Sequence, residues 1–121
     1  MEHKKELNVY NKMGLKSKDE CYTTYAEAKK IIDYLISESV LTKDMKIWLP
    51  FDNGLSNLYK YLKHLRYKTI LSNLEIGLDF YNYEPYEWYD IIITNPPFSK
   101  RTKLLKRMFS FKKPFVILQG T

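Results

Sequence analysis

The sequence predicts an α/β fold built on a mostly parallel sheet of about five strands. Its short apolar runs lack the alternation of polar and apolar residues, and such runs are typical of strands that are covered on both faces. Segments with apolar residues at helical spacing separate these runs. We expect residues 21–121 to form one α/β domain and residues 1–20, which are polar and rich in lysine, to form a flexible arm.

The individual elements follow from local patterns along the chain. Thr24 and Glu27 have the spacing of a capping box, which predicts that a helix begins there. The run before Pro50 predicts a buried strand, and the Asp-Asn-Gly sequence after it predicts a turn. The expected elements are helices at 24–38 and 55–66, a third helix around Leu104 and Met108, and strands at 46–51, 68–72, 90–94 and 114–118.

The composition excludes several classes of protein. The single cysteine, Cys21, rules out an internal disulfide, and with only two histidines we expect no metal site. No apolar run approaches the roughly 18 residues that a membrane span needs, and the first residues lack the apolar core of a secretory signal. We therefore expect a cytoplasmic protein without a membrane partner, in the host cytoplasm if the chain is viral.

The net charge of +6 arises from one short segment. Residues 100–113 contain seven bases, and the rest of the chain has 13 bases against 14 acids. This cluster has two interpretations, a solvated helix face or a surface that contacts the phosphates of a nucleic acid, with DNA favoured. On the second interpretation the contacting residues are Lys100, Arg101, Lys103, Lys106 and Arg107.

The most informative segment is the 95–98 motif, Asn95-Pro96-Pro97-Phe98, directly after the apolar run at 90–94. The two prolines fix the backbone and remove two N–H donors, so that carbonyl acceptors remain. The Asn95 side-chain oxygen and the Pro96 carbonyl can accept the two hydrogens of an exocyclic amine, and Phe98 can stack on its ring. Accepting both hydrogens directs the nitrogen lone pair toward an electrophile. The alternative is a proline turn that merely closes a core strand.

The 95–98 motif after a strand that begins with an acid resembles the catalytic motif of class I S-adenosylmethionine-dependent amino-methyltransferases. The group it resembles most is the N6-adenine DNA methyltransferases, which have Asn/Asp-Pro-Pro-Tyr/Phe at this place. The resemblance covers residues 22–118 and implies a Rossmann-like sheet, shorter than the seven strands of the family. It also implies S-adenosylmethionine as the cofactor, transfer of a methyl group to an adenine amine, and no metal.

Other segments resemble the family's cofactor site in the same order along the chain. Residues 22–24 resemble a Tyr-Thr-Pro element, residues 50–54 resemble a cofactor loop, and residues 79–80 resemble an Asp-Phe pair that contacts the cofactor adenine. The resemblance implies cofactor contacts from Tyr22, Thr23, Pro50, Phe51, Asp52, Asp79 and Phe80. The chain departs from the family where Leu49 replaces an acid, where Gly54 is the only glycine of the loop, and where Ser72-Asn73 replaces the acid that holds the ribose, with Glu75 as a possible substitute.

Two functional hypotheses remain open at this point. The first is an N6-adenine methyltransferase that acts on nucleic acid. The second is a catalytically inactive methyltransferase-fold module of phage or mobile-element type, which binds nucleic acid or a host protein as a regulator or inhibitor. A third and weaker interpretation is a generic basic α/β domain with a proline turn. The exposed edges of a short parallel sheet favour a homodimer or a protein partner.

Overall fold

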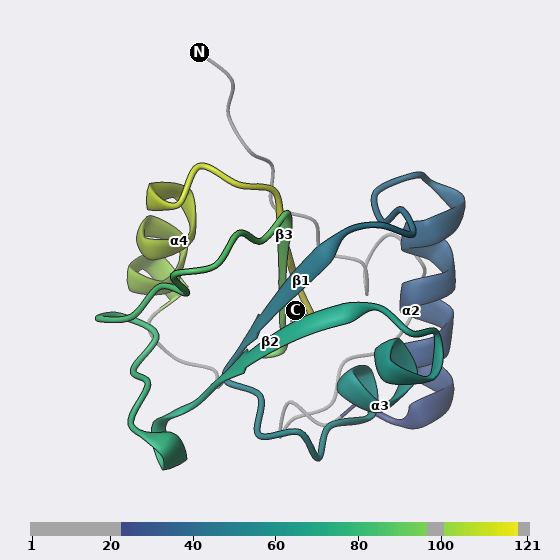
Figure 1. Cartoon of the computed structure of the whole chain (residues 1–121), viewed down its shortest axis with the longest axis horizontal. Coiled ribbons are helices and arrows are strands. Elements are labelled where there is room, and N and C mark those ends of the chain that lie inside the picture. The colour runs from purple at the N-terminus through teal and green to yellow at the C-terminus, as the bar shows by residue number, and fades with distance from the viewer. Residues whose placement is uncertain (1–22, 97–100, 119–121) are drawn as a thin grey trace.

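A four-stranded sheet lies between two layers in the computed structural model, which describes residues 23–96 and 101–118 (Figure 1). Helices α2 and α3 cover one face, and α4 lies on the other. The elements are α2 (Tyr25–Ser37), β1 (Lys46–Pro50), α3 (Asn57–His64), β2 (Lys68–Ser72), the short 3₁₀ helix η1 (Leu74–Ile76), β3 (Ile91–Thr94), α4 (Arg101–Ser110) and β4 (Phe115–Ile117). The expected α/β class is therefore confirmed.

All strand pairs in the sheet are parallel, and the strand order is β2-β1-β3-β4. Each strand lies within one or two residues of its expected position. The described residues form four strands, whereas about five were expected. The chain leaves β1 toward β2 and later returns to the other side of β1 to form β3. This reversal creates a topological switch point between β1 and β3, where open α/β sheets bind their ligands.

Alternate residues of the strands divide the core into two parts. Ile47 and Leu49 of β1 pack with Ile31 and Leu62 on the side of α2 and α3. Trp48, between them in sequence, packs with residues of β3, α4 and β4 on the opposite side. Both sets are almost completely buried, because each face of the sheet is covered. This double burial explains why the strands read as continuous apolar runs in the sequence.

The helix starts follow from capping side chains. The expected capping box of α2 is present, since the Thr24 hydroxyl accepts from the Glu27 N–H and the Glu27 carboxylate accepts from the Thr24 N–H. Helix α3 begins at Asn57 rather than at Leu55, because the Ser56 hydroxyl caps it by accepting from the Tyr59 N–H. The two residues before Ser56 are therefore part of the loop after β1.

Residues 78–90 connect η1 to β3 and pack on the α4 side of the sheet without forming a helix or strand. Phe80, Tyr83 and Tyr89 surround Trp48, with ring centroids 5.7, 6.2 and 5.2 Å from its ring. The aromatic residues of this segment thus supply part of the core. In the described part of the chain, none of the helices has the length and apolar character needed to cross a bilayer.

Candidate functional site

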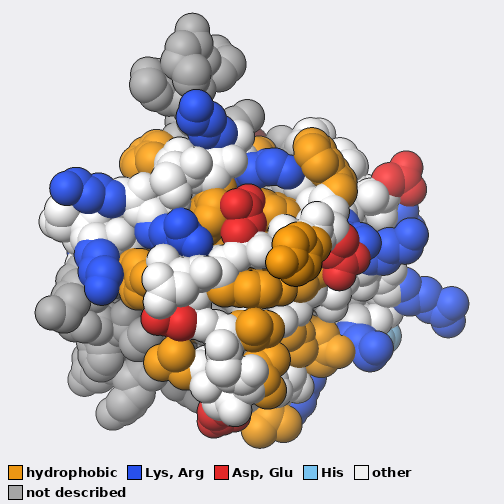
Figure 2. All heavy atoms as spheres, turned by 60° about the vertical axis from the view of Figure 1, so that its left-hand side comes forward, with side chains coloured by type: hydrophobic (Ala, Val, Ile, Leu, Met, Phe, Trp, Pro, Cys, Tyr) orange, Lys and Arg blue, Asp and Glu red, His pale blue; other side chains and the backbone are white. Residues whose placement is uncertain are grey.

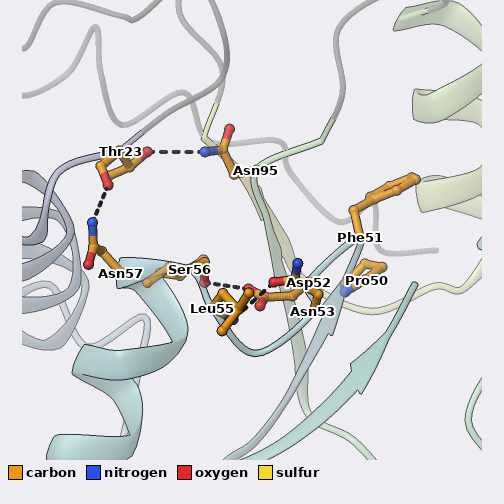
Figure 3. A pocket seen from close by; sticks show the side chains of 10 residues that line it. Thr23, Pro50, Phe51, Asp52, Asn53, Leu55, Ser56, Asn57 and Asn95 are labelled. Carbon is orange, nitrogen blue, oxygen red and sulfur yellow. Dashed lines mark hydrogen bonds between the residues drawn. The ribbon is translucent and has the colours of Figure 1, made fainter. Parts of the chain in front are cut away.

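A pocket of about 280 Å³ lies at the carboxyl ends of β1 and β3, at the topological switch point (Figure 3). Its volume is near the lower end of the range for small-molecule sites. The loop after β1 and the start of α3 form most of its wall, and Thr23 and Asn95 complete it. The lining residues are Thr23, Pro50, Phe51, Asp52, Asn53, Leu55, Ser56, Asn57, Leu58 and Asn95.

The loop after β1 is folded around the Asp52 carboxylate. The two carboxylate oxygens of Asp52 accept hydrogen bonds, one from the Gly54 N–H at 2.9 Å and one from the Ser56 hydroxyl at 2.7 Å. Asp52 is only 7% exposed, although it is the one ionisable residue among the ten that line the pocket. Gly54 adopts a φ of +86°, which residues with a side chain rarely adopt. The carboxylate is therefore used to hold the loop.

A second group of polar contacts joins the ends of β1 and β3. The buried Thr94 hydroxyl donates to the Pro50 carbonyl at 2.8 Å. Asn95, the next residue, directs its side-chain nitrogen to the Thr23 hydroxyl at 3.1 Å. Its side-chain oxygen points away from Thr23 (Figure 3). These contacts place the first residue of the 95–98 motif against the pocket.

Thr23 is also held from the opposite side, by the first residue of α3. The Asn57 side-chain nitrogen donates to the Thr23 carbonyl at 2.9 Å. Our interpretation of the sequence did not include Asn57, Asn53, Leu55, Ser56 or Leu58 as site residues. A signal for Ser56 and Asn57 was present, because they follow the turn after β1 and stand at the start of a helix, where polar side chains cap the helix or face the strand ends.

The end of β2 offers no carboxylate to the pocket. The Ser72 hydroxyl is fully buried and accepts from the Trp48 indole N–H at 3.0 Å. The Asn73 side chain donates to the Asp52 carbonyl at 2.9 Å and so braces the neighbouring loop. Glu75 lies exposed in η1. The Ser72 side chain therefore contributes to the core and the Asn73 side chain to the loop after β1.

Asp79 and Phe80 are not among the residues that line the pocket. Phe80 is buried in the α4-side core, with its ring centroid 4.9 Å from that of Phe51, which does line the pocket. The Asp79 carboxylate accepts from the Tyr81 N–H and from the Asn82 side chain. Phe80 thus reaches the pocket only through its contact with Phe51.

The expected nucleic-acid-binding residues differ in their surroundings. Arg101, Lys103 and Lys106 are exposed on α4, whereas Arg107 is partly buried and donates to two backbone carbonyls. The Lys103 ammonium lies 4.3 Å from the centroid of the Tyr81 ring. Figure 2 shows the face that carries α4 and residues 78–90, where basic side chains lie around a centre of apolar and acidic ones.

Four expected site residues, Tyr22, Pro97, Phe98 and Lys100, lie outside the described residues. Within residues 23–96 and 101–118, no three His, Cys, Asp or Glu side chains are grouped so that they could hold a metal ion. Comparison of the sequence with family models and with curated proteins, and of the structure with solved structures, gives no match.

Proposed function

We propose that this chain transfers a methyl group from S-adenosylmethionine to an adenine amine in nucleic acid, with DNA favoured. The observation that carries the proposal is the position of Asn95 at the switch-point pocket, with its side-chain nitrogen bound to Thr23 and its oxygen directed elsewhere. An acceptor oxygen at the end of a central parallel strand is what the 95–98 motif needs for binding an exocyclic amine.

The residues of the chain would bind and orient the amine. The Asn95 side-chain oxygen and the Pro96 carbonyl accept its two hydrogens, and Phe98 stacks on the base. S-adenosylmethionine supplies an electrophilic methyl group when it is bound. Asn95 and Pro96 would hold the amine with its lone pair toward this methyl group, whose transfer would leave the cofactor sulfur as a thioether and release one amine proton to water. Orientation of the lone pair by preorganised acceptors is the main contribution of the protein.

The pocket fits a nucleoside cofactor in part. Phe51 offers an aromatic ring, and Thr23 and Pro50 help to enclose a space of about 280 Å³. The Thr23 hydroxyl and the Pro50 carbonyl already accept hydrogen bonds from Asn95 and Thr94, so these two residues would act through the shape of the wall. Asp52 stabilises the loop and would act on the cofactor only through the shape of that loop. Phe80 would act from outside the lining, by supporting Phe51, and Asp79 would act only by holding the turn at residues 79–82.

Calorimetric titration with S-adenosylmethionine tests the proposal directly. We expect saturable binding to the wild-type chain, and we expect Asn95→Ala to bind the cofactor with nearly the same affinity but to lose methyl transfer to adenine-containing DNA. Asn82→Ala, which removes an amide outside the pocket, is the matched control and should keep both. Absence of binding at millimolar cofactor, or full transfer activity in Asn95→Ala, would show that the proposal is wrong.

One observation favours the second candidate function, a catalytically inactive module that binds nucleic acid or a host protein as a regulator or inhibitor. The Ser72 hydroxyl is buried against Trp48 and the Asp52 carboxylate is bound within its own loop, so neither is presented to ribose hydroxyls. This candidate predicts no cofactor binding together with salt-dependent binding of nucleic acid. The same titration therefore separates the two candidates.

A further inference from the structure

Thr23 connects three elements that are far apart in the sequence. It directly precedes the N-cap of α2, it accepts a hydrogen bond from Asn57 at the start of α3, and it accepts another from Asn95 at the end of β3 (Figure 3). The two bonds use different atoms, since Asn57 binds the backbone carbonyl and Asn95 binds the side-chain hydroxyl. Thr23 is only 6% exposed.

The hydroxyl of Thr23 is a fixed acceptor. Its backbone is held on one side by Asn57 and on the other by the capping box that begins at Thr24. Threonine is also restricted at χ1, because its β-carbon carries two heavy atoms. In this structure the hydroxyl oxygen accepts from the nitrogen of the Asn95 carboxamide, so the carboxamide oxygen faces the other way.

We propose that Thr23 is a positioning residue, which binds the nitrogen of the Asn95 carboxamide and so keeps the oxygen directed to the substrate amine. Loss of this bond removes a contact that holds the carboxamide in this orientation, and a carboxamide turned by half a turn would present its N–H₂ group to the amine. Two donors would then face each other, and the lone pair would lose its orientation. The effect on catalysis rests on the proposed methyl transfer, whereas the effect on the carboxamide does not.

The role differs from the cofactor contact that the sequence resemblance implies for Thr23. A residue that binds the cofactor changes the dissociation constant of the cofactor when it is altered. A positioning residue for Asn95 changes the rate of transfer and leaves that constant nearly unchanged. Thr23→Val keeps the shape and removes the hydroxyl, and Thr23→Ser keeps the hydroxyl, so the two variants separate packing from hydrogen bonding.

The carboxamide signals of Asn95 in ¹H–¹⁵N spectra provide the first measurement, and they are assigned by their loss in Asn95→Ala. We expect these signals to shift and their exchange with water to accelerate in Thr23→Val, and to remain near wild type in Thr23→Ser. Thr69→Val on β2, away from the pocket, is the matched control and should leave the signals unchanged. Unchanged Asn95 signals in a folded Thr23→Val protein would overturn the proposal.

A comparison within the wild-type protein keeps the test valid if Thr23→Val does not fold. Asn53 lies exposed at the same pocket and uses its side-chain oxygen to accept from the Leu55 N–H. We expect the N–H₂ protons of Asn95 to exchange with water more slowly than those of Asn53, because the Asn95 nitrogen is bound to Thr23. Equal exchange rates at the two residues would contradict the proposal.

Kinetics provide the second measurement. We expect Thr23→Val to lower kcat of methyl transfer about tenfold, the usual scale for one hydrogen bond, with the cofactor dissociation constant unchanged and activity restored in Thr23→Ser. A raised dissociation constant with unchanged kcat would assign Thr23 to cofactor binding instead. If the wild-type chain binds no cofactor, the proposed function fails, and the Asn95 signals still decide whether Thr23 orients the carboxamide.

Discussion

Arg107 belongs to the basic segment by sequence, yet its guanidinium group binds within the protein. It donates to the Phe80 carbonyl at 2.9 Å and to the Tyr83 carbonyl at 3.1 Å, and it lies 4.6 Å from the centroid of the Phe111 ring. A charged donor on two carbonyls, stacked beside an aromatic ring, is a stabilising arrangement. Arg107 therefore fixes residues 78–90 against α4.

This arrangement predicts different effects for two neighbouring bases. Arg107→Ala should lower the free energy of unfolding by about 2 kcal/mol, because two charge-assisted hydrogen bonds are lost and two carbonyls lose their donor. Lys106→Ala, at an exposed position on the same helix, should change it by no more than about 0.5 kcal/mol. Urea unfolding monitored by tryptophan fluorescence measures both. Equal losses in the two variants would contradict the structural role of Arg107.

Arg107 also shows a limit of sequence analysis at the level of the residue. The side chains that carry the chemistry, such as Asn95, stand out by type and by their place after a strand. The partners of Arg107 are backbone carbonyls, which every residue has, so no pattern of side chains identifies them. Likewise, the sequence places Asp52 in the loop after β1 but does not show that its carboxylate already accepts hydrogen bonds from the Gly54 N–H and the Ser56 hydroxyl.

Helix α4 has a buried apolar face and carries basic residues in its first turn, where positive charge is unfavourable for the helix. Leu104 and Met108 are buried, and the first turn contains Arg101 and Lys103 but no acid. The partial positive charge at the N-terminus of a helix makes bases there unfavourable for the helix itself. The same position, one short segment after the 95–98 motif, would attract phosphates. The stability of the helix therefore does not account for these bases, which the sequence predicts to contact nucleic acid.

If α4 contacts nucleic acid, its exposed lysines should determine part of the salt dependence. We expect the double variant Lys103→Ala/Lys106→Ala to weaken DNA binding and to reduce the slope of log K against log salt by about 2, because each phosphate contact contributes about 0.9. Lys60→Ala/Lys63→Ala on α3, at the opposite face of the sheet, is the matched control (Figure 1). An unaltered slope in the α4 variant would assign its bases to a solvated face.

The elements themselves could largely be predicted, and the reasons are local. The capping box of α2 and the β-branched run of β3 are consecutive patterns that depend little on distant residues. Helix α3 begins two residues later than the sequence predicts, because Ser56, which also binds Asp52, caps it. Residues 78–90 could not be predicted, because their position depends on aromatic contacts with Trp48, which is far away in the sequence.

At the scale of the whole molecule, the strand order determines where a site can exist. The sequence predicts parallel strands but contains no direct signal for their order, since the order depends on which strands pair across long connections. With the order β2-β1-β3-β4, the reversal falls between β1 and β3 and brings Asp52 and Asn95 to one pocket, which Thr23 joins through its hydrogen bonds with Asn57 and Asn95. The resemblance to the amino-methyltransferases implied that these residues share a site, and the topology supplies a physical reason for it.

The opposite end of the same two central strands is held by Asp90, directly before β3. Its carboxylate accepts from the Lys46 N–H at 2.8 Å and from the Trp88 indole N–H at 2.8 Å, and the Asp90 N–H donates to the Lys46 carbonyl. The hydrogen bonds from Lys46 and Trp88 lower the pKa of Asp90 below its ordinary value. The start of β1 is thus coupled to the start of β3 through an ionised carboxylate.

This coupling predicts how the stability of the whole molecule changes in acid. The folded state binds the Asp90 proton less readily than the unfolded state. The contribution of the Asp90 carboxylate to the free energy of unfolding is therefore complete above the ordinary carboxyl pKa of about 3.9, and it is lost as the pH falls through the lower pKa of the folded state. Asp90→Asn, which removes the charge and one acceptor, should therefore lower the free energy of unfolding at pH 7. The difference in the free energy of unfolding between this variant and wild type should narrow below about pH 4.

Asp44→Asn, at an exposed carboxylate before β1, is the control, and its free energy of unfolding should follow that of wild type over this pH range. Urea unfolding between pH 2 and pH 7 measures the difference, and a gap for Asp90→Asn that stays constant across that range would mean that the charge of Asp90 does not stabilise the junction of β1 and β3.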